Sequence, residues 1–207
     1  MKIKGEGSYV DASGARHEIF GVGDLPDDMA LRSLKVSGKL SFETISCDKV
    51  KVSGKCEGGF LAAKNFSVEG KVELDDLKVE QTFELEGKPK IDSIESDEIV
   101  IESQSGFVGT IKCNKLEIFN HTNATDTTDF ANIFTRKFFG EDIIHVDSKR
   151  ARVRIKSIEA ETVALENCEV DVIRCTNAVI GTNCKIDKLF VAGEYKISAD
   201  SKVGEIN

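Results

Sequence analysis

The sequence predicts an all-β fold, a right-handed parallel β-helix, on three observations: a repeat of 16–17 residues, apolar residues spaced by two within it, and a strand-rich composition. The segments LKVSGK (34–39), VKVSGK (50–55), FSVEGK (66–71) and FELEGK (83–88) recur at that interval. Such a period is typical of solenoids, in which each repeat stacks on the next. Seventeen Gly and only two Pro in 207 residues agree with many short strands joined by tight corners.

Within each repeat, the apolar residues form three pairs whose members lie two positions apart, as expected of strand residues that face the same side. The first complete set is Leu34/Val36, Leu40/Phe42 and Ile45/Cys47. Three inward pairs describe three short strands around a triangular prism. A glycine follows the first pair, where a sharp corner favours a residue without a Cβ atom. These corner glycines are Gly38, Gly54, Gly70 and Gly87.

The same spacing extends towards both ends of the chain. It places Ile19, Leu25 and Leu31 one coil before Leu34, and Ile3 and Tyr9 one coil earlier. Near the other end it assigns inward positions to Val163, Cys168/Val170, Ile173/Cys175, Val179, Cys184/Ile186, Leu189/Val191 and Tyr195/Ile197. About eleven coils are expected. The commonest left-handed solenoids have six residues per face, and the faces of this repeat do not keep that spacing. Parallel crossovers are also right-handed as a rule, so the right-handed form is predicted.

The repeat fails between residues 120 and 147, which divides one continuous domain into three parts. Solenoid coils occupy 1–119, an insertion occupies 120–147, and further coils occupy 148–207.

The insertion is predicted to hold a polar loop and then a short amphipathic helix that ends at Gly140. Its apolar residues recur at helical spacing, and they are Phe130, Ile133, Phe134 and Phe138. Two interpretations remain open: the helix packs on a solenoid face, or it forms a contact with a partner or a second copy.

Charge and hydropathy exclude several classes of partner. The net charge of −8 and the pI near 5.1 leave no basic field for a nucleic acid backbone. The first residues lack the apolar stretch of a signal peptide, and no later stretch approaches the ~20 apolar residues of a membrane span. We therefore expect a soluble cytoplasmic protein, with the inner face of the cell envelope as a further candidate location.

Catalytic motifs are not found, and no catalytic, cofactor-binding or metal-binding residue is predicted. There is no Gly-rich phosphate loop, and His17, His121 and His145 lie far apart without metal-site companions. The acidic pairs Asp75/Asp76 and Asp97/Glu98 are interpreted as solvated charge at corners of the coil. The six cysteines are interpreted as small buried apolar residues, with Cys168 and Cys184 one coil apart in one column.

The V-x-G-K coils, the entry segment KGEGSYVDASG and the closing segment VIGTNCKIDKLFVAGEYKIS together resemble the bactofilins, the polymer-forming bacterial cytoskeletal proteins. The interrupted form looks most like the longer Firmicute members of that family. The resemblance implies a right-handed β-helix that polymerises without a nucleotide and supports envelope- or motility-related assembly. It implies no catalytic residue and no cofactor.

The expected function comes from the ends of a solenoid, whose strand edges pair with another chain unless they are capped or charged. No capping helix is visible at either end of the repeat. The candidate end-to-end interface is Ile3 and Tyr9 in the first coil and Val203 and Ile206 in the last, with a second copy as the partner.

Two other interpretations compete with this scaffold. One is a monomeric or dimeric protein-binding module that grips its partner with the helix at 130–138. The other is a β-helix acyltransferase or carbohydrate-active enzyme, suggested by the isolated hexad-like IGTNCKI. That enzyme would require consecutive hexads or a deep charged groove, and neither is visible in the sequence.

Overall fold

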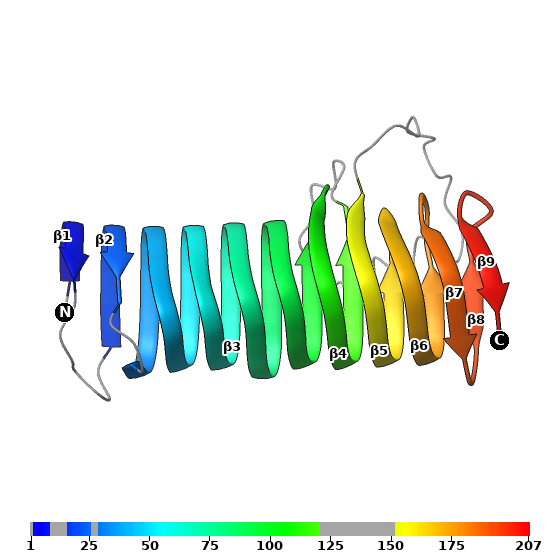
Figure 1. Ribbon diagram of the computed structural model, residues 1–207, viewed down its shortest axis with the longest axis horizontal. Coiled ribbons are helices and arrows are strands. Elements are labelled where there is room, and N and C mark those ends of the chain that lie inside the picture. Colours follow the sequence, from blue (N-terminus) through cyan, green and yellow to red (C-terminus); the bar gives the residue numbers. More distant parts are fainter. Residues whose placement is uncertain (1, 9–15, 26–28, 121–151) are drawn as a thin grey trace, which may run out of the picture.

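The computed structural model describes residues 2–8, 16–25, 29–120 and 152–207, and every structural statement below concerns these residues. In this part of the chain all regular elements are strands: β1 (Lys2–Ser8), β2 (Arg16–Asp24), β3 (Met29–Glu102), β4 (Gly106–Phe119), β5 (Val153–Leu165), β6 (Cys168–Ile180), β7 (Lys185–Val191), β8 (Tyr195–Ile197) and β9 (Lys202–Ile206). They belong to one sheet that winds around a single axis (Figure 1). The all-β solenoid prediction is therefore confirmed.

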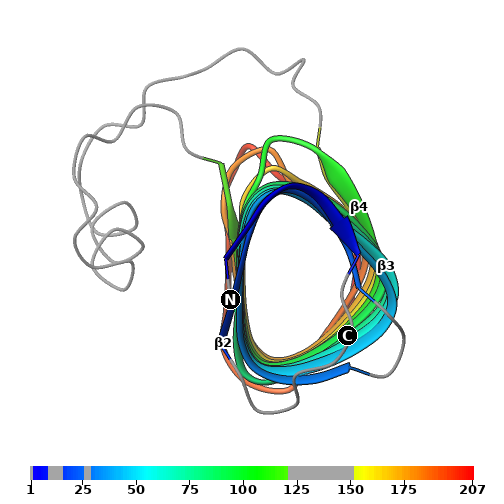
Figure 2. The ribbon, with the colours of Figure 1, turned by 90° about the vertical axis from the view of Figure 1, so that its left-hand side faces the viewer.

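The strands coil around a closed, roughly three-sided interior. Seen from the N-terminal end, the chain turns clockwise as it recedes, so the β-helix is right-handed (Figure 2). In the described residues the strand register carries one inward column through eleven levels, from Ile3 in β1 to Ile197 in β8, in agreement with the eleven coils predicted.

Neighbouring turns pair in parallel throughout the described chain. Ile3 pairs with Ile19 and Ile19 with Val36, which are steps of 16 and 17 residues. The step is 15 residues where Val163 pairs with Ala178, and 17 where Leu189 pairs with Ile206. The backward extension of the repeat to the first coil is therefore confirmed by the strand register.

The interior holds the apolar pairs that the spacing predicted. Leu40, Ile45 and Cys56 are almost completely buried, and the same holds for the inward residues of the following turns. Phe66 and Phe83 occupy one column in neighbouring turns, and their rings stack with centroids 5.4 Å apart. Each inward side chain is thus covered by its equivalents above and below, which is how a narrow solenoid acquires a dry core.

Strand β3 turns its corners without leaving the β-ladder because glycine occupies one corner of each turn. Gly38 and Gly54 have φ values of +133° and +132°, a conformation that L side chains rarely adopt. A Cβ atom on Gly54 would lie 2.1 Å from the carbonyl oxygen of Gly38 in the turn below. Glycine is therefore required both by the backbone angle and by the close contact between turns.

Asparagine takes over this corner in the C-terminal half, which the sequence analysis did not anticipate. Asn167 and Asn183 have φ values of 57° and 55°, in the left-handed region that asparagine tolerates. The Arg152 guanidinium donates to Oδ1 of Asn183 at 2.7 Å, and Nδ2 of Asn183 donates to Oδ1 of Asn167. Nδ2 of Asn167 donates in turn to the carbonyl oxygen of Gln104 at 3.1 Å. These side-chain hydrogen bonds link successive turns from Arg152 to Gln104.

Two inward assignments near the C-terminus need correction. Ala178, not Val179, faces the interior, because the turn that ends there is one residue shorter than the 16-residue repeat used to place it. Tyr195 has the predicted column position, since it pairs with Ala178, but its side chain is 48% exposed. Tyr195 belongs to the last turn, so no described residue covers it. The predicted short helix lies outside the described residues.

The cysteines behave as core residues, as predicted. Five are buried, Cys175 is half-buried, and all six are free thiols. Burial raises the pKa of Cys56 and of Cys113 to about 12 from the ordinary 9.0. Burial also raises the pKa of Cys168, which lies one turn below Cys184. The thiols of Cys56, Cys113 and Cys168 are therefore protonated, unreactive packing groups at neutral pH, whereas the hydrogen bond with Cys168 lowers the pKa of Cys184.

Alkaline pH is expected to destabilise the fold through these thiols. An unfolded thiol ionises near pH 9, whereas Cys56 in the fold stays protonated until its pKa of about 12. Its contribution is therefore complete below pH 9 and is lost as the pH rises towards 12, at about 1.4 kcal/mol per pH unit. In Cys56→Ala, the unfolding free energy measured by urea unfolding between pH 8 and 11 should therefore fall less steeply with pH, by that amount per pH unit. If the pH dependence is the same in Cys56→Ala and in the unmodified protein, Cys56 ionises in the fold.

Substitution of a corner glycine is expected to be more damaging than that of its exposed neighbour. In Gly54→Ala the strained backbone angle and the contact with Gly38 should lower the free energy of unfolding by about 2 kcal/mol or more. Ser53→Ala, one residue earlier and exposed, is the matched control and should change it by less than about 0.5 kcal/mol. Equal effects in thermal and urea unfolding would contradict the account of this corner.

Candidate assembly surfaces at the ends of the solenoid

The C-terminal end of the solenoid is formed by β8 and β9. Strand β8 pairs with β6, and β9 pairs with β7. The last turn is held to the turn below by further backbone bonds, including Ser198 N to Ile180 O at 2.8 Å and Asn207 N to Leu189 O at 2.9 Å. Within the described chain no strand lies on the other side of β8 or β9, so their outer edges face away from the stack (Figure 1).

This end exposes a cross-section of the apolar core. Leu189 is 0% exposed beneath Ile206, whereas Ile206, its partner one turn later, is 43% exposed. Ala178 and Tyr195 show the same change, from 1% to 48%. Val203 is half-buried and packs against the core from the same turn. The strand register places Ile206, Tyr195 and Val203 at inward positions. Their side chains are exposed because no further described turn covers them.

The N-terminal end presents the edge of β1. This strand pairs with β2 on one side and with no strand on the other side among the described residues. Ile3 pairs with Ile19, so its backbone lies in the column of inward residues. Ile19 is 1% exposed, which shows how closely the turns at this end are packed.

The predicted end residues are thus only partly placed. Val203 and Ile206 lie together on the last turn, and Ile3 lies on the edge strand at the opposite end (Figure 1). Tyr9 falls outside the described residues. Tyr195 and Ile197 also belong to the C-terminal end, although in the sequence they have the spacing of an ordinary inward pair. Their position in the final turn was the available signal.

The partner-binding alternative cannot be built from the described structure. Phe130, Ile133, Phe134 and Phe138 all lie outside the described residues, as do His121 and His145.

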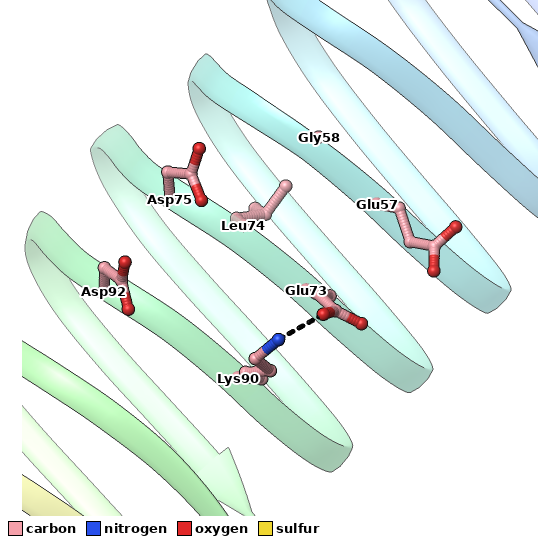
Figure 3. A pocket seen from close by; sticks show the side chains of 7 residues that line it. All are labelled: Glu57, Gly58, Glu73, Leu74, Asp75, Lys90 and Asp92. Carbon is pink, nitrogen blue, oxygen red and sulfur yellow. Dashed lines mark hydrogen bonds and ion pairs between the residues drawn. The ribbon is translucent and has the colours of Figure 1, made fainter.

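The acidic residues on the side of β3 line a shallow groove of about 330 Å³ (Figure 3). Its lining carboxylates are Glu57, Glu73, Asp75 and Asp92. The Lys90 ammonium donates to Oε1 of Glu73 and lies 17 residues, or one turn, further along the chain. The bond with Lys90 lowers the pKa of Glu73, so this carboxyl group is ionised at neutral pH. Asp75 and Asp92 lie at the other side of the groove, away from this pair (Figure 3).

Three of the carboxylates first identified at corners have hydrogen-bond partners one turn away. Ser93 Oγ donates to Asp76, and Nδ2 of Asn114 donates to Asp97 at 3.2 Å. The Lys115 ammonium donates to Oε1 of Glu98 at 2.8 Å, and all three contacts are exposed to solvent. These groups therefore act as links between the outer surfaces of neighbouring turns.

No group of three or more His, Cys, Asp or Glu side chains in the described ranges has the arrangement of a metal site. In the same ranges, no helix has the length and hydropathy needed to cross a membrane.

Comparison of this chain with protein-family models, curated proteins and solved structures finds no match.

Proposed function

We propose that this protein is a non-enzymatic, polymer-forming scaffold of the bactofilin type, which assembles through the ends of its solenoid without a nucleotide. The observation that supports the proposal most strongly is the open apolar end. Inward positions that are buried one turn earlier become 43–48% exposed at Ile206 and Tyr195.

A second copy supplies what this end lacks. Stacked on the last turn, it would cover Ile206 and Tyr195 and would pair with the outer edges of β8 and β9. Covering one such side chain stabilises a contact by about 1–2 kcal/mol, and edge pairing adds backbone hydrogen bonds. The contact needs no bound nucleotide or other group, because the same apolar burial and backbone hydrogen bonds hold neighbouring turns together within one chain.

The sides of the solenoid are less suited to such an apolar contact. Exposed large apolar side chains on the described sides, such as Phe20 and Phe60, occur singly, whereas charged residues are frequent there. Assembly through the ends therefore produces a rod with its polar sides available. We propose that these sides serve envelope- or motility-associated partners at the cytoplasmic face of the cell envelope.

Replacement of Ile206 by lysine tests the end contact. Ile206→Lys introduces a charge into the apolar cross-section, so filaments and higher oligomers should be lost while the melting temperature changes little. Phe60→Lys is the matched control, because Phe60 is 38% exposed but lies on the side of the rod. Light scattering against concentration and electron microscopy measure the outcome.

Assembly that is equally strong in Ile206→Lys and in the unmodified protein would contradict the proposed end contact. Particles of the unmodified protein that stay monomeric at every concentration would contradict the polymer itself.

A further inference from the structure

One side of the solenoid carries positive charges on two turns of β3 and negative charges on the turns that follow. Its central outward column is Lys35, Lys51, Ser67 and Glu84, each three residues before the glycine of its corner. The glycines themselves, from Gly38 to Gly87, stack directly on one another, so these four residues stand one above the next. Within these four turns the column therefore runs from cations to an anion, and Glu18 of β2 stands one turn before Lys35 in the same column.

Neighbouring outward residues reinforce this polarity. Lys49 lies beside the two lysines of the column, while Glu69 and Glu86 lie beside its other end, and all three are exposed. We call the surface formed by Lys35, Lys49, Lys51, Glu69, Glu84 and Glu86 the dipolar face. It belongs entirely to β3, which follows β2 in the N-terminal half of the rod and is remote from the last turn formed by β8 and β9 (Figure 1).

The charges at the two extremes of this face have no ion-pair partner among the described residues. Lys51 and Glu69 meet at its centre with Nζ and Oε1 3.3 Å apart, and both side chains are about half exposed, at 49% and 52%. Lys35 and Glu84 take part in no ion pair within the described ranges, although many neighbouring lysines and glutamates do. The face thus keeps unpaired positive charge on one side of its centre and unpaired negative charge on the other.

The rest of the face is flat and uncharged. Its other outward residues on these turns are small or polar: Ser33, Ser37, Ser53, Asn65, Ser67 and Thr82. Because these side chains are short, the six charged side chains are the groups that project furthest from the sheet and meet a facing surface.

We propose that two copies of this chain pair laterally, dipolar face against dipolar face, with their solenoid axes antiparallel. A two-fold axis between the turns of Lys51 and Ser67 places Lys35 of each copy opposite Glu84 and Glu86 of the other, because these residues lie equally far from the centre. The Lys51–Glu69 pairs of the two copies meet at the axis. A two-fold contact of this kind uses the same patch on both copies, so each favourable pair occurs twice.

Charge also selects the orientation and the occupant. In a parallel pair Lys35 would face Lys35 and Glu84 would face Glu84, which is repulsive. A polyanion would suit only the lysine part of the face, and a basic partner only the glutamate part. A second copy turned end for end satisfies both parts at once. This inference does not depend on the proposed end contact, because the two surfaces do not overlap.

Charge reversal with mixing tests the proposal. Lys35→Glu alone, and Glu84→Lys/Glu86→Lys alone, each set like charges against one another twice in the pair. Either variant should weaken lateral association by about tenfold or more at low salt. An equimolar mixture of the two variants should associate again, because every opposed pair is then of opposite sign. Sedimentation velocity at about 50 and about 300 mM salt, on chains that also carry Ile206→Lys to remove the end contact, measures it.

Two controls separate this effect from net charge and folding. Lys112→Glu and Glu159→Lys make matched reversals at exposed positions on another side of the rod, and they should leave association unchanged. Circular dichroism of each variant should show the unmodified β signal and melting temperature. Loss of pairing in the single variants with recovery in the mixture supports the antiparallel pair.

Three results would overturn it: monomers at low salt in the Ile206→Lys background, association that is insensitive to the reversals, or variants that do not recover on mixing. If the background chain pairs although the end contact proves wrong, the lateral inference stands alone. If filaments of one-solenoid width form and the reversals have no effect, the end contact stands and the lateral pair does not.

Discussion

The whole molecule depends on one constraint: a turn of this solenoid can bury its apolar side chains only if another turn lies on each side of it. A single coil has inward positions but no thickness, so it has no interior of its own. Leu189 lies above Ile173 in one column and both are 0% exposed, because each has a turn on both sides. Ile206, in the same column and 43% exposed, shows the constraint unsatisfied. Fold and proposed function thus come from the same interaction.

The corners explain why the stack can be so regular. Gly54 brings its backbone against Gly38 too closely for any side chain, and Asn167 and Asn183 turn the equivalent corner later with side-chain bonds. Because the corners align from turn to turn, the outward residues also align into columns. Cross-turn ion pairs such as Lys185–Glu169 at 2.8 Å result from this alignment. So does the dipolar face, where alignment concentrates charges that are scattered in the sequence.

Most of the fold could be predicted from the sequence because its signal is repeated. A single pair such as Val50/Val52 predicts little, but its recurrence with a corner glycine predicts strand, corner and register together. The prediction failed where the repeat changed length: the 15-residue turn moved the inward position from Val179 to Ala178. It also missed the asparagine corner, since Asn167 and Asn183 lack the glycine signal. The exposure of Tyr195 was missed as well, because exposure depends on whether another turn covers the residue in space.

The candidate interface was harder to predict than the fold, because an interface residue has the same pattern as a core residue. Ile206 continues the apolar column like any other inward position, and only its place in the last described turn marks it as exposed. The dipolar face has no sequence motif at all. Lys35 and Glu84 are 49 residues apart in the chain and become parts of one surface only when β3 coils.

The central claim is that the stacking of turns continues from one copy to the next along a shared axis. X-ray diffraction from oriented fibres of the assembled protein tests it most directly. If the stacking continues, a reflection at ~4.8 Å falls on the meridian, because the strands lie across the fibre axis. The same ~4.8 Å reflection on the equator, with strands along the fibre, would contradict it.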